Sequence, residues 1–184
     1  VNGGTGRAND TDTLLGDDSN DTLITSSGND TLSAGAGNDT AVVFGNYNTG
    51  TYTAPQDTFG SFDVDDYANN IGGTRAFTGT IDLGADTDTL ITYGGIDLTG
   101  ATLVDIENTV NNSSIELTDV QLDKLDTVTF EGGIPHTLRV EDTDANVDVD
   151  LGKITVNGGA LTVDITGNAA SGSVDDSSPV ASVS

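Results

Sequence analysis

The stretch RANDTDTLLGDDSNDTLITSSGNDTLSAGAGNDTAV, residues 7–42, consists of four nine-residue units placed end to end without a gap. Each unit has an aspartate at its sixth position, a threonine at its seventh and an apolar residue at its eighth. The residues before the aspartate are mostly small or polar and can turn tightly. The three residues after it predict a short strand whose apolar side chain points inward. The sixth-position aspartates are Asp12, Asp21, Asp30 and Asp39.

The repeat predicts that alternate units stack on one another. If two units form one turn of a flattened solenoid, the first and third units lie on one side and the second and fourth on the other. Neighbouring strands of such a stack are about 4.8 Å apart. The expected stacked pairs are Leu14 with Leu32, Leu23 with Ala41, Asp12 with Asp30, and Asp21 with Asp39.

The stacked aspartates predict cation sites. Two carboxylates at this separation repel each other unless a cation lies between them. Carboxylates and turn carbonyls are hard oxygen ligands, which suit the flexible six- to eight-fold coordination of Ca²⁺ better than the strict octahedron of Mg²⁺. The pattern therefore indicates a ladder of calcium sites along the turns.

These residues closely resemble the RTX nonapeptide, Gly-Gly-x-Gly-x-Asp-x-apolar-x, of bacterial secreted proteins. The match is good at positions six to eight and poorer at the glycines, and unit 7–15 has no glycine. The resemblance implies a parallel β-roll, export through a type I system, and folding on external calcium. In that family the sixth-position aspartate and backbone carbonyls of paired turns hold the ion. The implied calcium-site residues are Asp12, Asp21, Asp30 and Asp39, with the turn glycines Gly28 and Gly37.

Composition excludes several classes of partner. The chain has 184 residues and carries 30 acidic against 5 basic residues, a net charge of −25. Nucleic acid is not expected as a partner, because phosphate contacts need clustered Lys and Arg. Insertion into a membrane is not expected either, since no apolar run approaches the necessary length. The chain has no Cys, so disulfides and soft-metal sites are excluded.

The rest of the chain predicts further strands. A two-turn roll is too short to stand alone, so we expect the remaining chain or neighbouring domains to stack on it. We expect four parts: a calcium-binding β-roll over 1–45, an irregular excursion over 46–76, a β-solenoid-like domain over 77–167, and a Ser-rich tail or junction over 168–184. The excursion holds a candidate hairpin between Tyr47 and Thr53. Its aromatic side chains either plug the end of the core or form a surface for sugar or a partner.

Short alternating strands recur between 77 and 167, separated by Gly-Gly and Asn-Asn turns. We expect an all-β chain in which the parallel β-roll continues into a right-handed parallel β-solenoid with coils of roughly 15–20 residues. The alternative is a β-roll followed by an Ig-like sandwich. A part of this stretch also resembles segments of large RTX surface-layer and matrix proteins. The expected strands are Ile81–Leu83, Ile96–Leu98, Ile115–Leu117, Thr127–Phe130, Thr137–Val140, Val147–Leu151, Ile154–Val156 and Leu161–Ile165.

One segment is predicted to be helical. Thr118 can cap a helix of about two turns that ends near Leu125, and Gln121 stands at the capping-box position.

Asp88 is a further candidate calcium ligand. The segment Asp-Thr-Asp-Thr-Leu at 86–90 repeats residues 10–14 letter for letter, which places Asp88 at position six of an isolated unit. An acid from elsewhere would complete its site. The alternative is that the match reflects a composition rich in Thr and Asp. Two acidic clusters, at 63–66 and 141–150, are either solvated faces or further ion sites, and neither has EF-hand spacing.

Catalysis has little support in the sequence. His136 is the only histidine, and it follows a Gly-Gly-Ile-Pro turn, where we expect it on the surface. No GxSxG, HExxH or thiol is present. We therefore expect no enzyme.

The expected function is a structural calcium-binding domain of a secreted bacterial surface-layer, matrix or adhesin protein, located outside the cell or on its surface. Self-association into a filament or sheet is expected, and surface polysaccharide is a candidate ligand. The alternative is a calcium-dependent folding or carbohydrate-binding module of a secreted RTX enzyme, whose catalytic residues would lie outside this chain.

Overall fold

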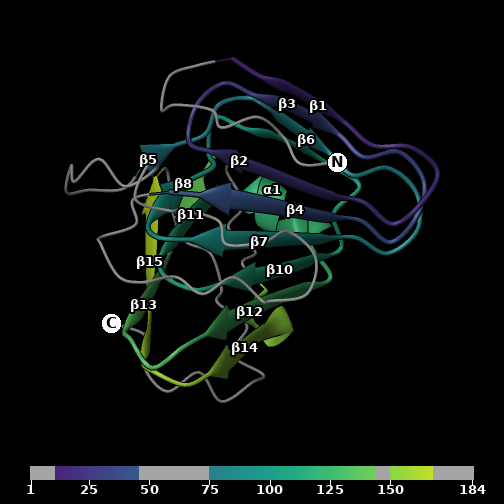
Figure 1. The fold of residues 1–184 in the computed structure, drawn as a ribbon. Helices are drawn as coiled ribbons and strands as arrows, with labels where there is room; N and C mark the ends of the chain where they lie inside the picture. The colour runs from purple at the N-terminus through teal and green to yellow at the C-terminus, as the bar shows by residue number, and fades with distance from the viewer. Residues whose placement is uncertain (1–10, 46–74, 144–149, 168–184) are drawn as a thin grey trace.

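The structure, a computed structural model, describes residues 11–45, 75–143 and 150–167. In these residues the chain is almost entirely β, and parallel strands stack as a solenoid of about five turns (Figure 1). The helical elements are α1 (Asp119–Lys124) and a 3-10 turn, η2 (Leu151–Lys153). The strands are β1 (Thr13–Leu15), β2 (Thr22–Ser26), β3 (Thr31–Ser33), β4 (Thr40–Phe44), β5 (Arg75–Ala76), β6 (Thr80–Asp82), β7 (Thr89–Tyr93), β8 (Ile96–Asp97), β9 (Thr102–Val104), β10 (Asn108–Asn111), β11 (Ile115–Thr118), β12 (Thr127–Glu131), β13 (His136–Asp142), β14 (Ile154–Asn157) and β15 (Leu161–Gly167).

The strands form three sheets. Sheet A has the order β1-β3-β6-β9, sheet B the order β14-β12-β10-β7-β4-β2, and sheet C the order β15-β13-β11-β8-β5. All strand pairs among the described residues are parallel. This confirms the predicted solenoid. The alternative Ig-like sandwich, which requires antiparallel pairing, is wrong for this part of the chain.

The first coils follow the nine-residue repeat. Sheets A and B face each other there, and the pairs Leu14 with Leu32 and Leu23 with Ala41 stack as expected, two repeat units apart in the sequence. From β5 onward each coil also passes through sheet C. The coil from β12 to β14 is longer than the coil from β10 to β12, in part because its sheet C strand, β13, is longer than β11. Coil length in the later part of the solenoid is therefore not constant.

The nonapeptide units and the later strands share two sheets. β3 pairs with β6 through Leu32 and Ile81, and β4 pairs with β7 through Ala41 and Leu90. Each of these pairs joins residues that lie far apart in the sequence. The predicted hairpin at 47–53, the aromatic plug and the Ser-rich tail lie outside the described residues.

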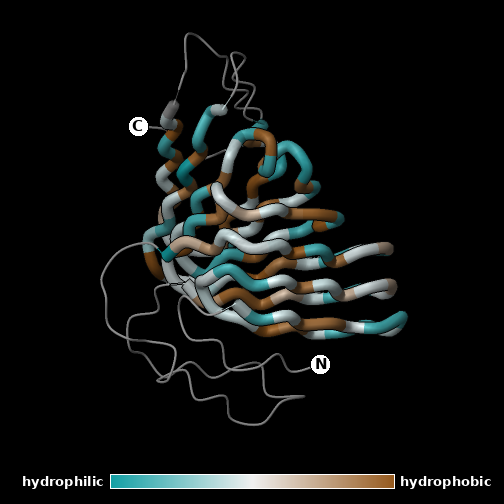
Figure 2. The backbone as a smooth tube through the Cα atoms, turned by 90° about the horizontal axis from the view of Figure 1, so that it is seen from above, coloured by the Kyte–Doolittle hydropathy of each residue, from teal (hydrophilic) through white to brown (hydrophobic). Residues whose placement is uncertain are grey.

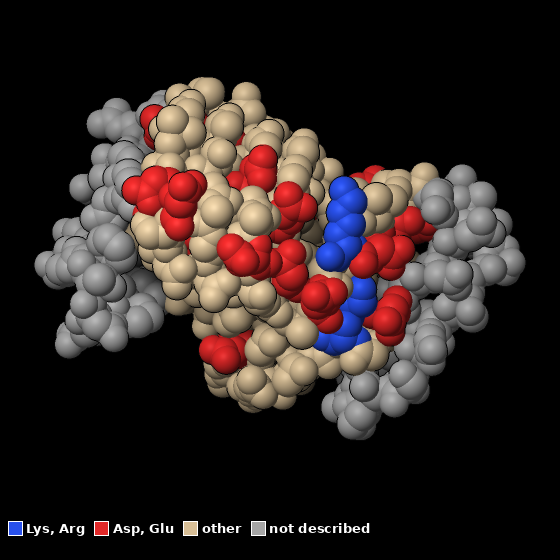
Figure 3. All heavy atoms as spheres, turned by 90° about the vertical axis from the view of Figure 1, so that its right-hand side faces the viewer, with Lys and Arg blue, Asp and Glu red and all other residues tan. Residues whose placement is uncertain are grey.

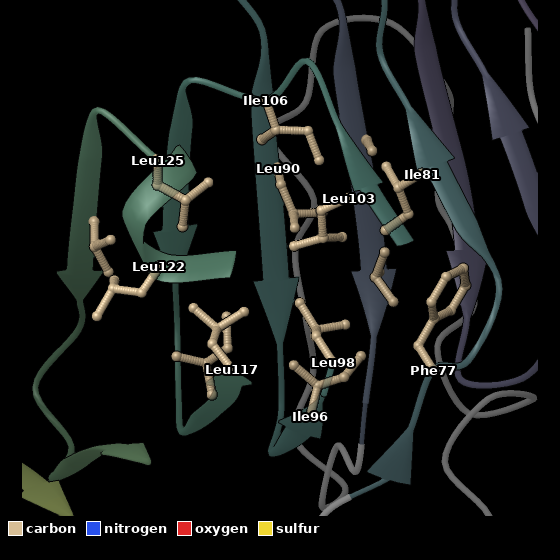
Figure 4. Packing of buried hydrophobic residues seen from close by; sticks show 14 of the residues in the cluster. Phe77, Ile81, Leu90, Ile96, Leu98, Leu103, Ile106, Leu117, Leu122 and Leu125 are labelled. Carbon is tan, nitrogen blue, oxygen red and sulfur yellow. The ribbon is translucent and has the colours of Figure 1, made fainter. Parts of the chain in front are cut away.

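One apolar core runs along the axis of the solenoid. Buried and less buried residues alternate along strands such as β7 and β13, as expected for side chains that point alternately inward and outward. Figure 2 shows the stacked coils with hydrophobic and hydrophilic residues interspersed along the backbone. Figure 4 shows Ile81 and Leu103 of sheet A, Leu90 of sheet B and Ile96 of sheet C converging on this core. The interior is thus packed with side chains, and apolar burial supplies the main stabilisation of the coils.

Helix α1 occupies the place of a sheet A strand. In the preceding coil the chain passes from β8 through β9 to β10, and in the next it passes from β11 through α1 to β12. The predicted capping box is present, since the Thr118 hydroxyl accepts the Gln121 N–H and the Gln121 side chain accepts the Thr118 N–H. Gln121 Nε2 also donates to the carbonyls of Leu98 and Ala101, at 2.7 and 2.8 Å. The prediction of a short helix is confirmed.

Two expectations fail in this part of the chain. His136 is buried, with 1% of its surface exposed, because β13 begins there and alternation points its ring inward against Phe130. The expected surface position is wrong.

The sequence predicts Leu151 at the end of a strand that begins at Val147, but Leu151 opens the 3-10 turn η2, where the Asp150 carboxylate accepts the Gly152 N–H. Residues 144–149 are outside the described part.

No helix among the described residues is long and apolar enough to cross a membrane.

Candidate metal centre

Three turns stack at the entrance to sheet B. We call residues 16–21, 34–39 and 83–88 the sheet B turns. The Ala36 N–H donates to the Asp17 carbonyl at 3.1 Å, which joins the first two turns. The Ala85 N–H donates to the Gly35 carbonyl at 3.0 Å, which joins the second and third. The third turn thus continues the stack although it lies far along the sequence from the other two.

The acids at the ends of these turns form a ladder. The N–H of Asp21 donates to Asp39 Oδ1 at 2.7 Å, and the N–H of Asp39 donates to Asp88 Oδ1 at 2.7 Å. The N–H of Asp88 donates in turn to Glu107 Oε2 at 2.8 Å. We call these four residues the acid ladder. The expected pairing of Asp21 with Asp39 is therefore present, and the partner acid expected for Asp88 is Asp39.

A second ladder of asparagines runs beside the first. The Asn38 N–H donates to Asn20 Oδ1 at 2.9 Å, and the Thr87 N–H donates to Asn38 Oδ1 at 3.1 Å. These bonds hold successive sheet B turns in register next to the acids.

Two carboxylate oxygens of the acid ladder are buried without a hydrogen bond. Asp39 is 2% exposed and Asp88 is fully buried, and the Oδ2 atom of each has no donor. Burial raises the pKa of Asp88, and the nearby charges of Asp39, Glu107 and Asp86 raise it further, against the hydrogen bond from the Asp39 N–H. Buried anionic oxygens are costly unless a cation or donor meets them. This set of hard oxygens fits Ca²⁺.

The sheet A side is different. The Asp12 N–H donates to Asp30 Oδ1 at 2.9 Å, so the predicted pair of Asp12 and Asp30 also stacks. The second oxygen of Asp30, however, accepts the Thr25 hydroxyl. In the next coil Gly79 stands where an acid would continue the row, and a Cβ there would lie 1.8 Å from the Asp30 carbonyl. Both oxygens of the Asp30 carboxylate therefore have protein donors, and the row ends at this residue.

Gly28 and Gly37, which the resemblance implies as calcium-site residues, lie in the turns before Asp30 and Asp39. Gly37 has a φ of 128°, and a Cβ at this residue would lie 2.8 Å from the backbone of Ser19. Gly28 lies in the turn before Asp30, and its carbonyl accepts the Thr78 N–H at 2.7 Å. Any side chain at Gly37 would thus push the sheet B turns apart.

Side chains alone do not complete a metal site. Within 11–45, 75–143 and 150–167, no group of three or more His, Cys, Asp or Glu side chains converges. An ion at the ladder would need main-chain oxygens of the turns and water besides two carboxylates. Sequence reasoning missed Glu107. It lies directly before β10 as Asp88 lies directly before β7, and this shared position is the signal that could have found it.

Comparison with known proteins agrees with the repeat. Residues 8–41 match the family described as RTX calcium-binding nonapeptide repeat, in four copies. Residues 8–41 of this chain are thus RTX-type calcium-binding repeats. No curated protein and no solved structure matches it. We call the matched residues the RTX segment; Asp12, Asp21, Asp30 and Asp39 lie within it, whereas Asp88 and Glu107 lie outside. RTX repeats bind calcium and are typical of secreted proteins.

Proposed function

We propose that this chain is a calcium-dependent scaffold domain of a secreted bacterial surface-layer, matrix or adhesin protein. The observation that carries the proposal is the continuity of sheets A and B through the RTX segment and the later coils. A stack of coils with a filled core is a rod whose length grows with each coil, which suits a shaft or lattice element. His136, the one histidine, is buried against Phe130, which favours a structural role over a catalytic one.

The charge of the chain supports dependence on external calcium. Acidic side chains spread over the face shown in Figure 3, where basic side chains form one short stretch. With a net charge of −25, self-repulsion opposes compaction, and each bound Ca²⁺ removes two negative charges. A chain of this kind would stay expanded until it meets the calcium outside the cell, as export in an unfolded state requires.

A calcium titration tests the proposal. Circular dichroism and size-exclusion chromatography should show a gain of β-structure and compaction as Ca²⁺ rises into the millimolar range, and excess chelator should reverse both. Binding to the folded state alone adds about 2.7 kcal/mol at a hundredfold excess over Kd. Mg²⁺ at equal concentration is the control and should have much less effect. A spectrum that does not change with Ca²⁺ would exclude the proposal.

Assembly into filaments or sheets extends the proposal. Strands β14 and β15 are the last strands of sheets B and C among the described residues. An outer strand edge presents N–H and C=O groups that can pair with another chain, and Ca²⁺ can bridge the acidic surfaces that would otherwise repel. Light scattering and electron microscopy should show calcium-dependent filaments or sheets. A sharp monomer peak at high protein concentration with calcium present would count against assembly by this chain alone.

A further inference from the structure

The turn at 83–88 is a fifth repeat unit that lies outside the RTX segment. Gly84 has a φ of 89° and stacks on Gly35, whose φ is 112°. Asp86, with a φ of 96°, occupies the position that Gly37 holds in the turn below, at a φ of 128°. The following strands β7 and β4 pair in register. The backbone of this turn therefore has the form of the nonapeptide turn, with Asp88 at its sixth position.

The two unpartnered oxygens of the acid ladder belong to this junction. Asp39 Oδ2 and Asp88 Oδ2 are buried and accept no hydrogen bond, while the Oδ1 atoms of both residues accept backbone N–H groups. On the sheet A side the corresponding oxygen of Asp30 has the Thr25 hydroxyl as its donor. In Asp21, at the start of the ladder, Oδ2 accepts the Asp17 N–H at 2.7 Å. Within the acid ladder, the buried oxygens without a donor therefore belong to Asp39 and Asp88, two acids joined directly by the hydrogen bond from the Asp39 N–H to Asp88 Oδ1.

We propose that Ca²⁺ binds between Asp39 and Asp88 and joins the RTX segment to the rest of the solenoid. Each residue contributes its Oδ2 atom, and backbone carbonyls of the two turns and water complete the coordination. The inference rests on the proposed function only in taking the repeats to bind calcium. Its consequence is specific: one ion connects residues 49 positions apart in the sequence, one at the start of β4 and the other directly before β7.

Counting bound ions tests the site. Native mass spectrometry and equilibrium dialysis would compare the unchanged chain with Asp88→Asn and with Asp86→Asn. Asp86→Asn is the matched control, because Asp86 is exposed in the same turn, loses the same charge and keeps a residue that tolerates positive φ. We expect Asp88→Asn to hold one Ca²⁺ fewer than the unchanged chain and Asp86→Asn to hold the same number.

The outcomes separate this site from the proposed function. If the unchanged chain binds no calcium, the proposed function fails as a whole. If it binds calcium and Asp88→Asn keeps every ion, the junction site is excluded while the RTX segment still functions as proposed.

A luminescent probe covers the case in which Asp88→Asn does not fold. The chain contains no Trp, so Thr87→Trp would place the only indole next to Asp88, at an exposed position whose backbone N–H bond to Asn38 is kept. Tb³⁺ in place of Ca²⁺ should then emit on excitation of this indole, and added Ca²⁺ should remove the emission. Trp introduced at exposed Thr162 in β15, another coil of the solenoid, is the control and should give at least tenfold less emission. Equal emission from both positions would exclude an ion at the junction.

Discussion

At the scale of single residues, small differences decide which turn can take an ion. Asp39 and Asp30 are both buried sixth-position acids, but the Thr25 hydroxyl satisfies the second oxygen of Asp30. The next coil then has Gly79 on one side and Asp88 on the other. Gly79 allows the chain to pass close to the Asp30 carbonyl, where no side chain fits. The row of acids therefore continues on the sheet B side alone.

Coupling between Asp21 and Asp39 is the prediction at this scale. Asp21→Ala and Asp39→Ala should each raise the calcium concentration at the folding midpoint, Asp39→Ala more strongly because its carboxylate is buried and accepts the Asp21 N–H. The double variant should cost less than the sum of the two, since residues in one network are not additive. Calcium titrations followed by circular dichroism measure all three.

Asp18→Ala is the control for this cycle, because Asp18 is an exposed acid in the same turn as Asp21. It should shift the midpoint only slightly. Strict additivity of the two substitutions would mean that the carboxylates bind separate ions or none.

At the scale of elements, α1 marks the end of sheet A. The last strand of sheet A is β9, and in the next coil α1 takes the place of a strand. Gln121 completes the capping box, and its side chain also donates hydrogen bonds to the carbonyls of Leu98 and Ala101 in the neighbouring coil. One side chain therefore both stabilises the start of the helix and binds the loop before β9. At the other end of α1, Lys153 Nζ donates to the carbonyls of Leu122 and Leu125, at 3.1 and 2.9 Å. The short helix is therefore held at both ends by contacts with other coils.

Substitutions in the capping box should separate these roles. Thr118→Ala should cost about 1 kcal/mol of unfolding free energy, the usual loss for a cap. Gln121→Ala should cost more, because it also removes the side-chain donor to the Ala101 carbonyl, at about 1–3 kcal/mol for a group left unsatisfied. The Leu98 carbonyl loses one donor and keeps the Ala101 N–H at 2.8 Å. Urea denaturation in saturating calcium measures both values. Val120→Ala, at a half-exposed position of the same helix, is the control, and a larger loss for Thr118→Ala than for Gln121→Ala would contradict the assignment.

Asp119 should make the stability of this region depend on pH. Burial raises the pKa of Asp119, but hydrogen bonds from the Thr143 hydroxyl and from the backbone N–H groups of Val120 and Thr143 outweigh it, and the net pKa is lowered. A lowered pKa in the folded state stabilises the fold above the unfolded pKa of about 3.9 and loses this contribution as pH falls through the folded value. Asp119→Asn should therefore lower the melting temperature at neutral pH, and the difference should shrink in strong acid.

Thermal unfolding at neutral and strongly acid pH, at fixed calcium, measures this difference. Asp123→Asn removes the same charge from an exposed position of α1 and should show little loss at either pH. A loss from Asp119→Asn that does not change with pH would point to packing in place of charge.

At the scale of the whole molecule, the shared sheets predict one cooperative unit. Sheet B runs from β2 in the RTX segment to β14 near the end of the described chain, without an interruption between β4 and β7. Elements that share a sheet and a core tend to unfold together. Hydrogen exchange measured at increasing calcium concentrations should therefore show that the backbone amides of β2 and β12 become protected at the same calcium concentration. Protection of β2 at clearly lower calcium than β12 would show that the RTX segment folds alone.

The sequence by itself determined the local repeat and its register. A period of nine residues with Asp at position six and an apolar residue at position eight allows one stacking that buries the apolar side chains, and Leu14 lies over Leu32 as this requires. The cap of α1 was equally readable, because a capping box involves only residues three positions apart. Features that depend only on the spacing of nearby residues can therefore be predicted from the sequence.

Only the tertiary structure decided the features that join distant parts of the chain. The pairing of Asp39 with Asp88 crosses an interruption of the period, and no local pattern specifies which later turn stacks on the last repeat. Glu107 and the buried His136 became visible for the same reason, since their positions depend on which strand lies next to them in space. Stacking energy comes from contacts between coils, and these contacts depend on the three-dimensional path of the chain as well as on the residues near each position.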